Sequence, residues 1–451
     1  MINDILQRLM AAQTEEERRW IATESLLESL PKEVKSALWA VAIPHWFNVE
    51  ILAALCPELA DRAEEIYRQL QTISCVEVFP ERGHNVHELT RNQLLERLWK
   101  DSPERFRELS DRAAVYFAQT NRPENQIEWI YHLAVANPDR CINELSDLAN
   151  AWQNAFRRAE LDSLIAFLQM QIRANRTTVA VKAETIYWDG KIKSRFYQAK
   201  EALERYEAAL AFYREIGARL GEANTLQAIG AVLRFLKRST EALEMYEEAL
   251  TFFREIDYSL GEANTLKAIG DVLQFLKQST KALQMYEAAI AIYCEIGDRL
   301  GEANTLKAIG DVLQFLKRST EALEKYKTVL AFYHEIGAHL GEANTLQSIA
   351  ILEEDPVIGL ASSQTALNLY IEIGDKYSQA RNLNYFTSNI QLKLGQKAEA
   401  ISSLTLASKL AQEINYQPMV DYANQKIAEI NGASQGIRGW FNWIKTKLWK
   451  D

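Results

Sequence analysis

The sequence predicts an all-α protein in which an array of repeated helix pairs follows a smaller helical module. The first observation behind this prediction is a duplication, because the block GEANTLKAIGDVLQFLK stands at 261–277 and again, unchanged, at 301–317. The second is the period: a close variant begins at Gly221 and a more divergent one at Gly341, so the unit returns every 40 residues. Self-similarity at such a period is typical of stacked units, none of which can bury its apolar face alone.

The composition excludes several classes of protein. At 451 residues the chain is long enough for two or three domains, or for a solenoid with an attached globular part. Its formal charge of -10 argues against nucleic-acid binding through the whole surface, which needs a basic face. The four cysteines form no CxxC pair, which argues against a zinc site or a disulfide framework and favours a reducing compartment. Because we find neither a signal-peptide pattern nor a long apolar run, we expect a cytoplasmic protein.

Residues 1–120 are predicted to form a helical module that contains one small hairpin. A first helix is expected over 2–30 from its apolar periodicity, and Asn48 is a good N-cap for a short helix further on. The β-prone run Cys75–Phe79, followed by turn residues and by Asn85–Val86, predicts the hairpin. Helices, a hairpin and a further helix together give a winged-helix-like outline.

The segment after the hairpin resembles part of a known family. The string HNVHELTRNQLLERL is similar to the end of the winged-helix domain in STAND-type signalling ATPases, where a Met-His-Asp motif touches bound ADP. Val86, His87 and Glu88 stand at that motif here, so only His87 matches it. No GxxxxGK[ST] sequence occurs anywhere, so the phosphate-binding loop of those ATPases is absent.

The same segment allows other interpretations. His87 can simply begin the helix that follows the hairpin. His84 and His87 form a HxxH pair, but without a third ligand in view we expect no metal site. The basic residues that a winged helix would turn to DNA alternate with acidic ones, as on a solvated helix, so we expect no nucleic-acid partner. These basic residues are Arg91, Arg97, Lys100 and Arg105.

Residues 121–180 are predicted to be an apolar helical connector. Pro123 and Pro138 mark helix boundaries, and the segment has none of the composition of a flexible linker. We therefore expect the module and the array to be rigidly docked.

The array is predicted from small residues at fixed offsets in alternating amphipathic helices. Gly270, Ala282 and Ala289 repeat the pattern of the preceding unit and would let two helices approach closely, while Tyr286 fills the space beside them. This spacing resembles the tetratricopeptide repeat in a form with extended helices, and the resemblance covers roughly residues 181–418. It implies a right-handed solenoid. The predicted units are 181–220, 221–260, 261–300, 301–340, a shortened 341–377 and 378–418, followed by a capping helix at 419–430.

The first helix of each unit carries a second, polar stripe at i, i+3, i+7 and i+10. The resemblance implies that this face lines a concave groove, which takes an extended peptide or a partner helix. Lysines in the stripe are candidates for selecting an acidic side chain, and the alternative is a solvated surface copied by duplication. The predicted partner-binding residues are Asn224, Gln227, Arg234, Asn264, Lys267, Asp271, Gln274, Asn304, Lys307, Asp311, Gln314, Asn344 and Gln347. Phe235, Phe275 and Phe315 are expected to pack between repeats.

The last residues, 431–451, form a linker and a tryptophan-rich tail. As a helix, IRGWFNWIKTKLWKD has one apolar face and basic flanks, which is the pattern of an interfacial helix on an anionic membrane. The alternatives are that the tail folds back on the array or pairs with a second chain. The predicted membrane contacts are Ile437, Trp440, Phe441, Ile444, Lys445, Lys447 and Leu448.

These patterns favour a non-catalytic scaffold or adaptor that binds a peptide or a partner helix in the groove. The alternative is a STAND-like signalling subunit that acts with a separate nucleotide-binding chain and is tethered to a membrane by its tail. Carboxylates are plentiful but lie on repeated helix surfaces, with no isolated Ser/His/Asp or Cys/His set, so we expect no enzyme and no cofactor.

Overall fold

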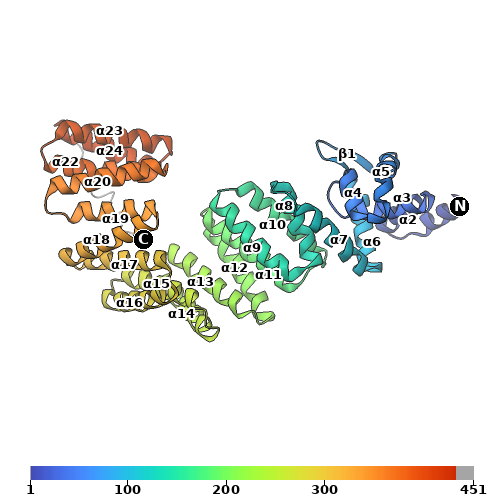
Figure 1. Ribbon diagram of the computed structural model, residues 1–451, viewed down its shortest axis with the longest axis horizontal. Coiled ribbons are helices and arrows are strands. Elements are labelled where there is room, and N and C mark those ends of the chain that lie inside the picture. Colours follow the sequence, from blue (N-terminus) through green and yellow to red (C-terminus); the bar gives the residue numbers. More distant parts are fainter. Residues whose placement is uncertain (1, 433–451) are drawn as a thin grey trace. The chain divides into compact units, whose positions relative to one another are not determined.

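The computed structural model describes residues 2–432. They fold as two compact units, and the division falls between Arg238 and Ser239. Helices dominate both units, and the only strands among the described residues form one hairpin (Figure 1). The all-α prediction, with repeated helix pairs in the array, is confirmed. None of the described helices is both long enough and apolar enough to cross a membrane.

The first unit begins with short helices around the hairpin and continues as a series of longer helices. Its elements are α1 (Ile2–Ala11), α2 (Glu15–Ser29), α3 (Lys32–Val41), α4 (Val49–Leu55), a 3-10 turn (Pro57–Arg62), α5 (Ala63–Gln71), β1 (Val76–Phe79), β2 (Gly83–Val86), α6 (Glu88–Asp101), α7 (Pro103–Phe117), α8 (Pro123–Ala136), α9 (Pro138–Asn154), α10 (Arg158–Arg173), α11 (Val179–Arg195), α12 (Ala199–Glu215) and α13 (Arg219–Phe235).

Local chemistry explains where these helices start. Asn48 caps α4 as predicted, since its side-chain oxygen accepts a 2.9 Å hydrogen bond from the Ile51 N–H. The single helix expected over 2–30 is wrong, because Thr14 starts a new helix there. Thr14 and Glu17 form a reciprocal capping box, which satisfies backbone donors at the start of α2.

The hairpin is antiparallel and is extended by a neighbouring loop. Val76 pairs with Val86 and Phe79 with Gly83. Phe47 adds a third short stretch, since its N–H donates to the His84 carbonyl at 2.7 Å and its own carbonyl accepts from the His84 N–H at 2.9 Å. Gly83 has a φ of +102°, and a Cβ there would lie 2.5 Å from the Phe47 carbonyl oxygen, so only glycine fits.

Buried polar residues join the loop at residues 43–47 to two helices. Arg91 on α6 is only 4% exposed and donates to the carbonyls of Ile43 and Pro44, so its placement on a solvated face was wrong. Glu128 on α8 is fully buried and accepts hydrogen bonds from His45 at 2.6 Å and from His132 at 3.1 Å. An ionised carboxylate is stable at such depth only with partners of this kind.

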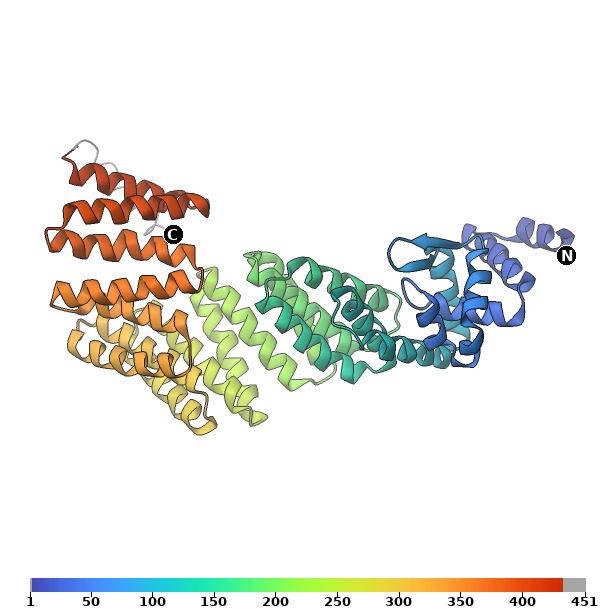
Figure 2. The same ribbon diagram turned by 45° about the horizontal axis from the view of Figure 1, so that its top comes forward.

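The second unit consists of helix pairs in which consecutive helices lie side by side (Figure 2). Its elements are α14 (Ser239–Glu255), α15 (Ser259–Phe275), α16 (Ser279–Ile296), α17 (Arg299–Phe315), α18 (Ser319–Glu335), α19 (His339–Leu352), α20 (Pro356–Glu372), α21 (Lys376–Asn382), a π-helical segment (Leu383–Thr387), α22 (Ser388–Lys393), α23 (Lys397–Glu413) and α24 (Gln417–Ile430).

Glycines pack against aromatic rings both within the pairs α15–α16 and α17–α18 and between α16 and α17. A Cβ at Gly270 would lie 2.5 Å from the ring of Tyr286, and a Cβ at Gly301 would lie 2.4 Å from the ring of Tyr293. Real Cβ atoms do not approach so closely, so both glycines are required by packing rather than by backbone conformation. The same contact recurs between Gly310 and Tyr326.

The pattern changes at α19. This helix ends at Leu352 and has 14 residues, whereas α17 has 17. Pro356 then stands at the first position of α20, where its missing N–H costs no hydrogen bond, and Asp355 caps that helix. The fifth pair has Ser363 where Tyr326 stands in the fourth, and Ser363 bonds Asn382 and Thr387 in a buried polar network.

Candidate functional site

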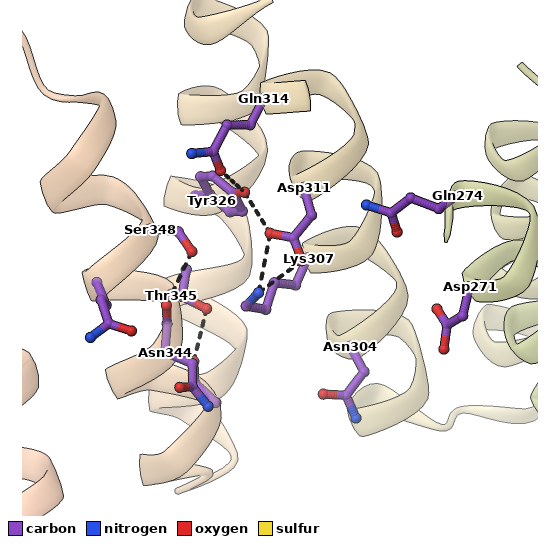
Figure 3. A network of polar contacts seen from close by, with 12 residues as sticks. Asp271, Gln274, Asn304, Lys307, Asp311, Gln314, Tyr326, Asn344, Thr345 and Ser348 are labelled. Carbon is purple, nitrogen blue, oxygen red and sulfur yellow. Dashed lines mark hydrogen bonds and ion pairs between the residues drawn. The ribbon is translucent and has the colours of Figure 1, made fainter. Parts of the chain in front are cut away.

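The polar stripe of the array lies along one face of α15, α17 and α19 in the second unit. Asn264 and Asn304 are exposed, while Lys267 and Lys307 are half-buried. Figure 3 shows Lys307, Asp311 and Gln314 following one another along α17. The three α13 residues predicted to bind a partner, Asn224, Gln227 and Arg234, belong to the first unit.

Each asparagine of this face is held by a tyrosine from the following helix. The hydroxyls of Tyr293 and Tyr333 donate to the side-chain oxygens of Asn264 and Asn304, both at 2.7 Å. Tyr370 does the same to Asn344 at 2.8 Å. Each of these oxygens accepts a tyrosine proton, which fixes the direction of the amide, and the Asn344 oxygen accepts a second hydrogen bond from Arg381 at 3.1 Å. Among the described residues, the amide nitrogens of Asn264 and Asn304 donate to no other group.

The lysines of the stripe are paired within their own helices. Lys267 lies 2.9 Å from Asp271, and Lys307 lies 3.0 Å from Asp311. The Tyr326 hydroxyl donates to Asp311 at 2.6 Å and to Gln314 at 3.0 Å (Figure 3). Burial and the Asp311 carboxylate raise the pKa of Tyr326, so this hydroxyl stays protonated and acts as a donor. The charge of each of these lysines is therefore balanced by an aspartate of the same helix, and neither lysine is an unpaired cation that would select an acidic side chain.

Two hollows open on this face. One of about 490 Å³ lies between α15 and α17, and its lining includes Asn264, Lys267, Asp271 and Asp298. The other, of about 480 Å³, lies between α17 and α19. Their sizes fall in the range of ligand pockets. Asn304 and Lys307 line both hollows, so the two adjoin along α17.

Gln347 lies deeper than its place in the stripe predicted. It is 5% exposed, its nitrogen donates to Asn382 at 3.1 Å, and its oxygen accepts from Arg381 at 2.8 Å. A side chain with both amide ends engaged inside the protein is not a surface contact. We therefore withdraw Gln347 from the candidate site.

Sequence analysis missed Arg381 and the half-exposed leucines at the groove edge. Arg381 stands at the position of Asn344 in the next unit and donates to the Asn344 side chain at 3.1 Å. The shortened fifth unit hid it, because the offset there is 37 residues instead of 40. Leu300 and Leu340 are 49% and 50% exposed and line the hollows. Their recurrence before each Gly-Glu-Ala-Asn string was the available signal.

Other predicted positions are placed as follows. Phe235, Phe275 and Phe315 are 60%, 62% and 55% exposed, so they are not buried between repeats, although the Phe235 ring lies 6.3 Å from the ring of Tyr197 in the preceding unit. His87 stands at the N-cap of α6 without a side-chain capping bond. Within residues 2–432 no group of three or more His, Cys, Asp or Glu is placed to hold a metal ion. The predicted membrane contacts, from Ile437 to Leu448, lie outside the described residues.

Comparisons with known proteins agree with this fold. The family model of the tetratricopeptide repeat matches residues 195–255, 238–295 and 261–335. A search of curated proteins finds no match.

Two solved structures resemble the chain over most of its length. A signal transduction ATPase with numerous domains (STAND) from Pyrococcus horikoshii, which has a tetratricopeptide repeat sensor, is 13% identical with a TM-score of 0.50. The match covers 93% of this chain and 68% of that one. The apo form of the quorum sensor NprR from B. thuringiensis is 17% identical, with a TM-score of 0.52 and coverage of 80% and 96%. At these identities the likeness is one of fold.

Proposed function

We propose that this protein is a non-catalytic scaffold, and that the face of α15, α17 and α19 binds an extended peptide segment of a partner protein. The tetratricopeptide-type repeats in the array support a protein-interaction role in general terms. The observation that carries the specific proposal is the set of hydrogen bonds from tyrosines to the stripe asparagines.

Those hydrogen bonds fix the direction of each amide. An asparagine side chain has an oxygen that can accept two hydrogen bonds and an NH2 group that can donate two, and a free side chain rotates to suit its partner. With its oxygen held by Tyr293 or Tyr333, the amide presents N–H groups toward the hollow. An extended peptide has carbonyl oxygens that fit such donors, and holding the amide in advance reduces the entropy lost on binding.

The charge balance of the face fits the same kind of ligand. Lys267 and Lys307 are each paired with an aspartate of their own helix, so a strongly charged ligand would have to break an ion pair. A peptide main chain is neutral and polar, so it can form hydrogen bonds with these groups without breaking the ion pairs. Binding in this groove is therefore governed by main-chain hydrogen bonds and by side-chain pockets.

A direct test uses the full chain and a random peptide library displayed on phage. The double variant Asn264→Ala with Asn304→Ala should bind the selected peptides on the order of tenfold more weakly, since two charge-free hydrogen bonds are lost. Asn368→Ala is the matched control, because Asn368 is an exposed asparagine on α20 that lines neither hollow. If the library yields no binding peptides, or if the control weakens them as much as the double variant, the proposal is wrong.

A second candidate function is a signalling subunit that works with a nucleotide-binding chain. The fold likeness to the STAND protein covers 93% of this chain and so includes the helical module as well as the repeats. In this case the isolated chain should bind neither ADP nor ATP, because it lacks a phosphate-binding loop. Isothermal titration of both nucleotides against the full chain tests that point, and binding to the isolated chain would contradict it.

A further inference from the structure

The hollow between α17 and α19 differs in chemistry from its neighbour. Its apolar lining comes from three places: Leu300 on α17, Leu340 on α19 and Ile373 just after α20. These side chains are 49%, 50% and 39% exposed, although they gather around one cavity. Apolar side chains that line a cavity and remain in contact with water are a mark of a ligand pocket.

Polar groups also line this hollow, among them the Lys307 ammonium and the His339 imidazole. Asn304 and Asn344 lie on its two sides, and both side-chain oxygens are held by tyrosines. Lys307 also reaches it but is paired with Asp311. No carboxylate lines the hollow, whereas Asp271, Asp298 and Asp311 all line the one between α15 and α17.

One residue accounts for much of that contrast. Asp298 and Ala338 occupy equivalent positions 40 residues apart, each as the N-cap of the next helix. Their backbones are alike, with φ and ψ of -78° and 84° for Asp298 and of -84° and 66° for Ala338. Asp298 caps α17 by accepting a 3.0 Å hydrogen bond from the Gly301 N–H, and its side chain lines the first hollow. Ala338 makes no side-chain cap and adds no carboxylate to the second hollow.

We propose that the hollow between α17 and α19 is the specificity pocket of the groove and takes one bulky aliphatic or aromatic side chain of the bound peptide. This inference rests on the proposed function, since Asn304 and Asn344 would hold the main chain on either side of that residue. The partner is thus an extended segment that carries a large apolar side chain at one fixed position.

The pair of equivalent N-caps supplies a test that preserves the fold. Ala338→Asp introduces into the second hollow the carboxylate that the first already has, at a backbone position where aspartate caps a helix. Its melting temperature should therefore not fall below that of the wild type. Asp298→Ala is the matched control, because it removes a carboxylate from the first hollow and leaves the second unchanged.

The probe is a random decapeptide library displayed on phage and selected on the immobilised full chain. We expect the wild type to enrich peptides with Leu, Ile, Met or Phe at one fixed position. Synthetic copies of these peptides should bind Ala338→Asp on the order of tenfold more weakly by fluorescence anisotropy, because burying a carboxylate beside an apolar side chain is unfavourable. Binding to Asp298→Ala should stay within about twofold of the wild type.

The outcomes separate the pocket from the function it rests on. Enriched peptides that share no apolar position, or that bind Ala338→Asp as tightly as the wild type, overturn the pocket while peptide binding stands. Equal losses in Ala338→Asp and Asp298→Ala also overturn it, since the effect would then not be specific to this hollow. A library that yields no binding peptide defeats the proposed function, and the pocket with it.

Discussion

The hydroxyl of Tyr333 donates a 2.7 Å hydrogen bond to the side-chain oxygen of Asn304, joining a core residue of α18 to a surface residue of α17. Tyr333 is 1% exposed, and a pKa raised to about 12, chiefly by burial, keeps it a proton donor at neutral pH. The surface amide is therefore oriented by the core of the repeat.

The first prediction concerns this hydroxyl. Changing Tyr293 and Tyr333 together to phenylalanine should weaken peptide binding by roughly three- to tenfold, because the two asparagines lose the bonds that fix their direction. Phe253 stands at the equivalent position in the preceding unit, so the ring alone is tolerated there. Peptide affinity by anisotropy and a thermal melt measure the two effects separately. Unchanged affinity would show that the tyrosines only support the fold.

The second prediction concerns the glycine contact within a helix pair. Gly270→Ala should lower the free energy of unfolding by about 1–3 kcal/mol, since the new methyl group would lie 2.5 Å from the Tyr286 ring. Repeating the change in a Tyr286→Leu background should cost less, because the ring that causes the clash is gone. Chemical denaturation of the four proteins gives the coupling. Equal costs in both backgrounds would mean that this contact is not the cause.

The third prediction concerns Asp257, which has a positive φ of 53° at a position where Gly217 and Gly297 stand in neighbouring units. Asp257→Gly should stabilise the protein by about 0.5–1 kcal/mol, because a left-handed backbone is less strained at glycine. Gly297→Ala is the reverse control and should destabilise it. The melting temperatures of the two variants should move in opposite directions, and a fall for Asp257→Gly would contradict this account.

The fourth prediction concerns pH and the buried group around Glu128. Burial lowers the pKa values of His45 and His132, and the nearby Arg91 guanidinium adds to this effect. The Glu128 pKa is also lowered, because the attraction and hydrogen bonds of the two histidines outweigh the effect of its burial.

All three groups therefore bind protons more readily in the unfolded chain. Above their unfolded pKa of 6.5 the two histidines do not reduce the stability of the protein. As the pH falls below 6.5, the free energy of unfolding decreases by up to about 1.4 kcal/mol per pH unit for each imidazole. Glu128 adds a loss as the pH falls below its unfolded pKa of 4.5. Denaturation at pH 7 and pH 5 measures the slope, which should flatten in His45→Asn with His132→Gln. An equal slope in that variant would place the pH dependence elsewhere.

Repetition made much of the fold predictable. The recurring Gly, Ala and Tyr positions located the helix pairs, and an N-cap such as Asn48 is a local signal that tertiary packing did not overrule. The degree of burial of individual side chains was harder to predict. Periodicity assigns a residue to a helix face but not to a depth: Phe275, the last residue of α15, is 62% exposed. Arg91 is buried because a distant loop supplies carbonyls for it.

The candidate site was likewise predictable where the repeat is regular and unpredictable where it is not. The stripe on α15 and α17 follows from the repeat, since those helices have identical sequences over 261–277 and 301–317. The unit that begins with α19 is three residues shorter than the others, so the residues of the next unit are shifted by three positions. Arg381 and Asn382 of that next unit bond to Gln347 and cover it. A strict 40-residue alignment has no means of showing that shift.

The same Leu-Gly junction joins successive units, and this affects how the array can change in length. Leu-Gly stands at 260–261 and again at 300–301, so removing residues 261–300 joins Leu260 to Gly301 and recreates a junction already present in the chain. In the intact chain Phe253 packs against Gly261, and Tyr293 packs against Gly301. After the deletion Gly301 would follow Phe253 instead of Tyr293, so an aromatic ring is still available to pack against this glycine. Deleting or duplicating residues 261–300 therefore changes the length of the array by one whole unit and creates no new sequence at the junction.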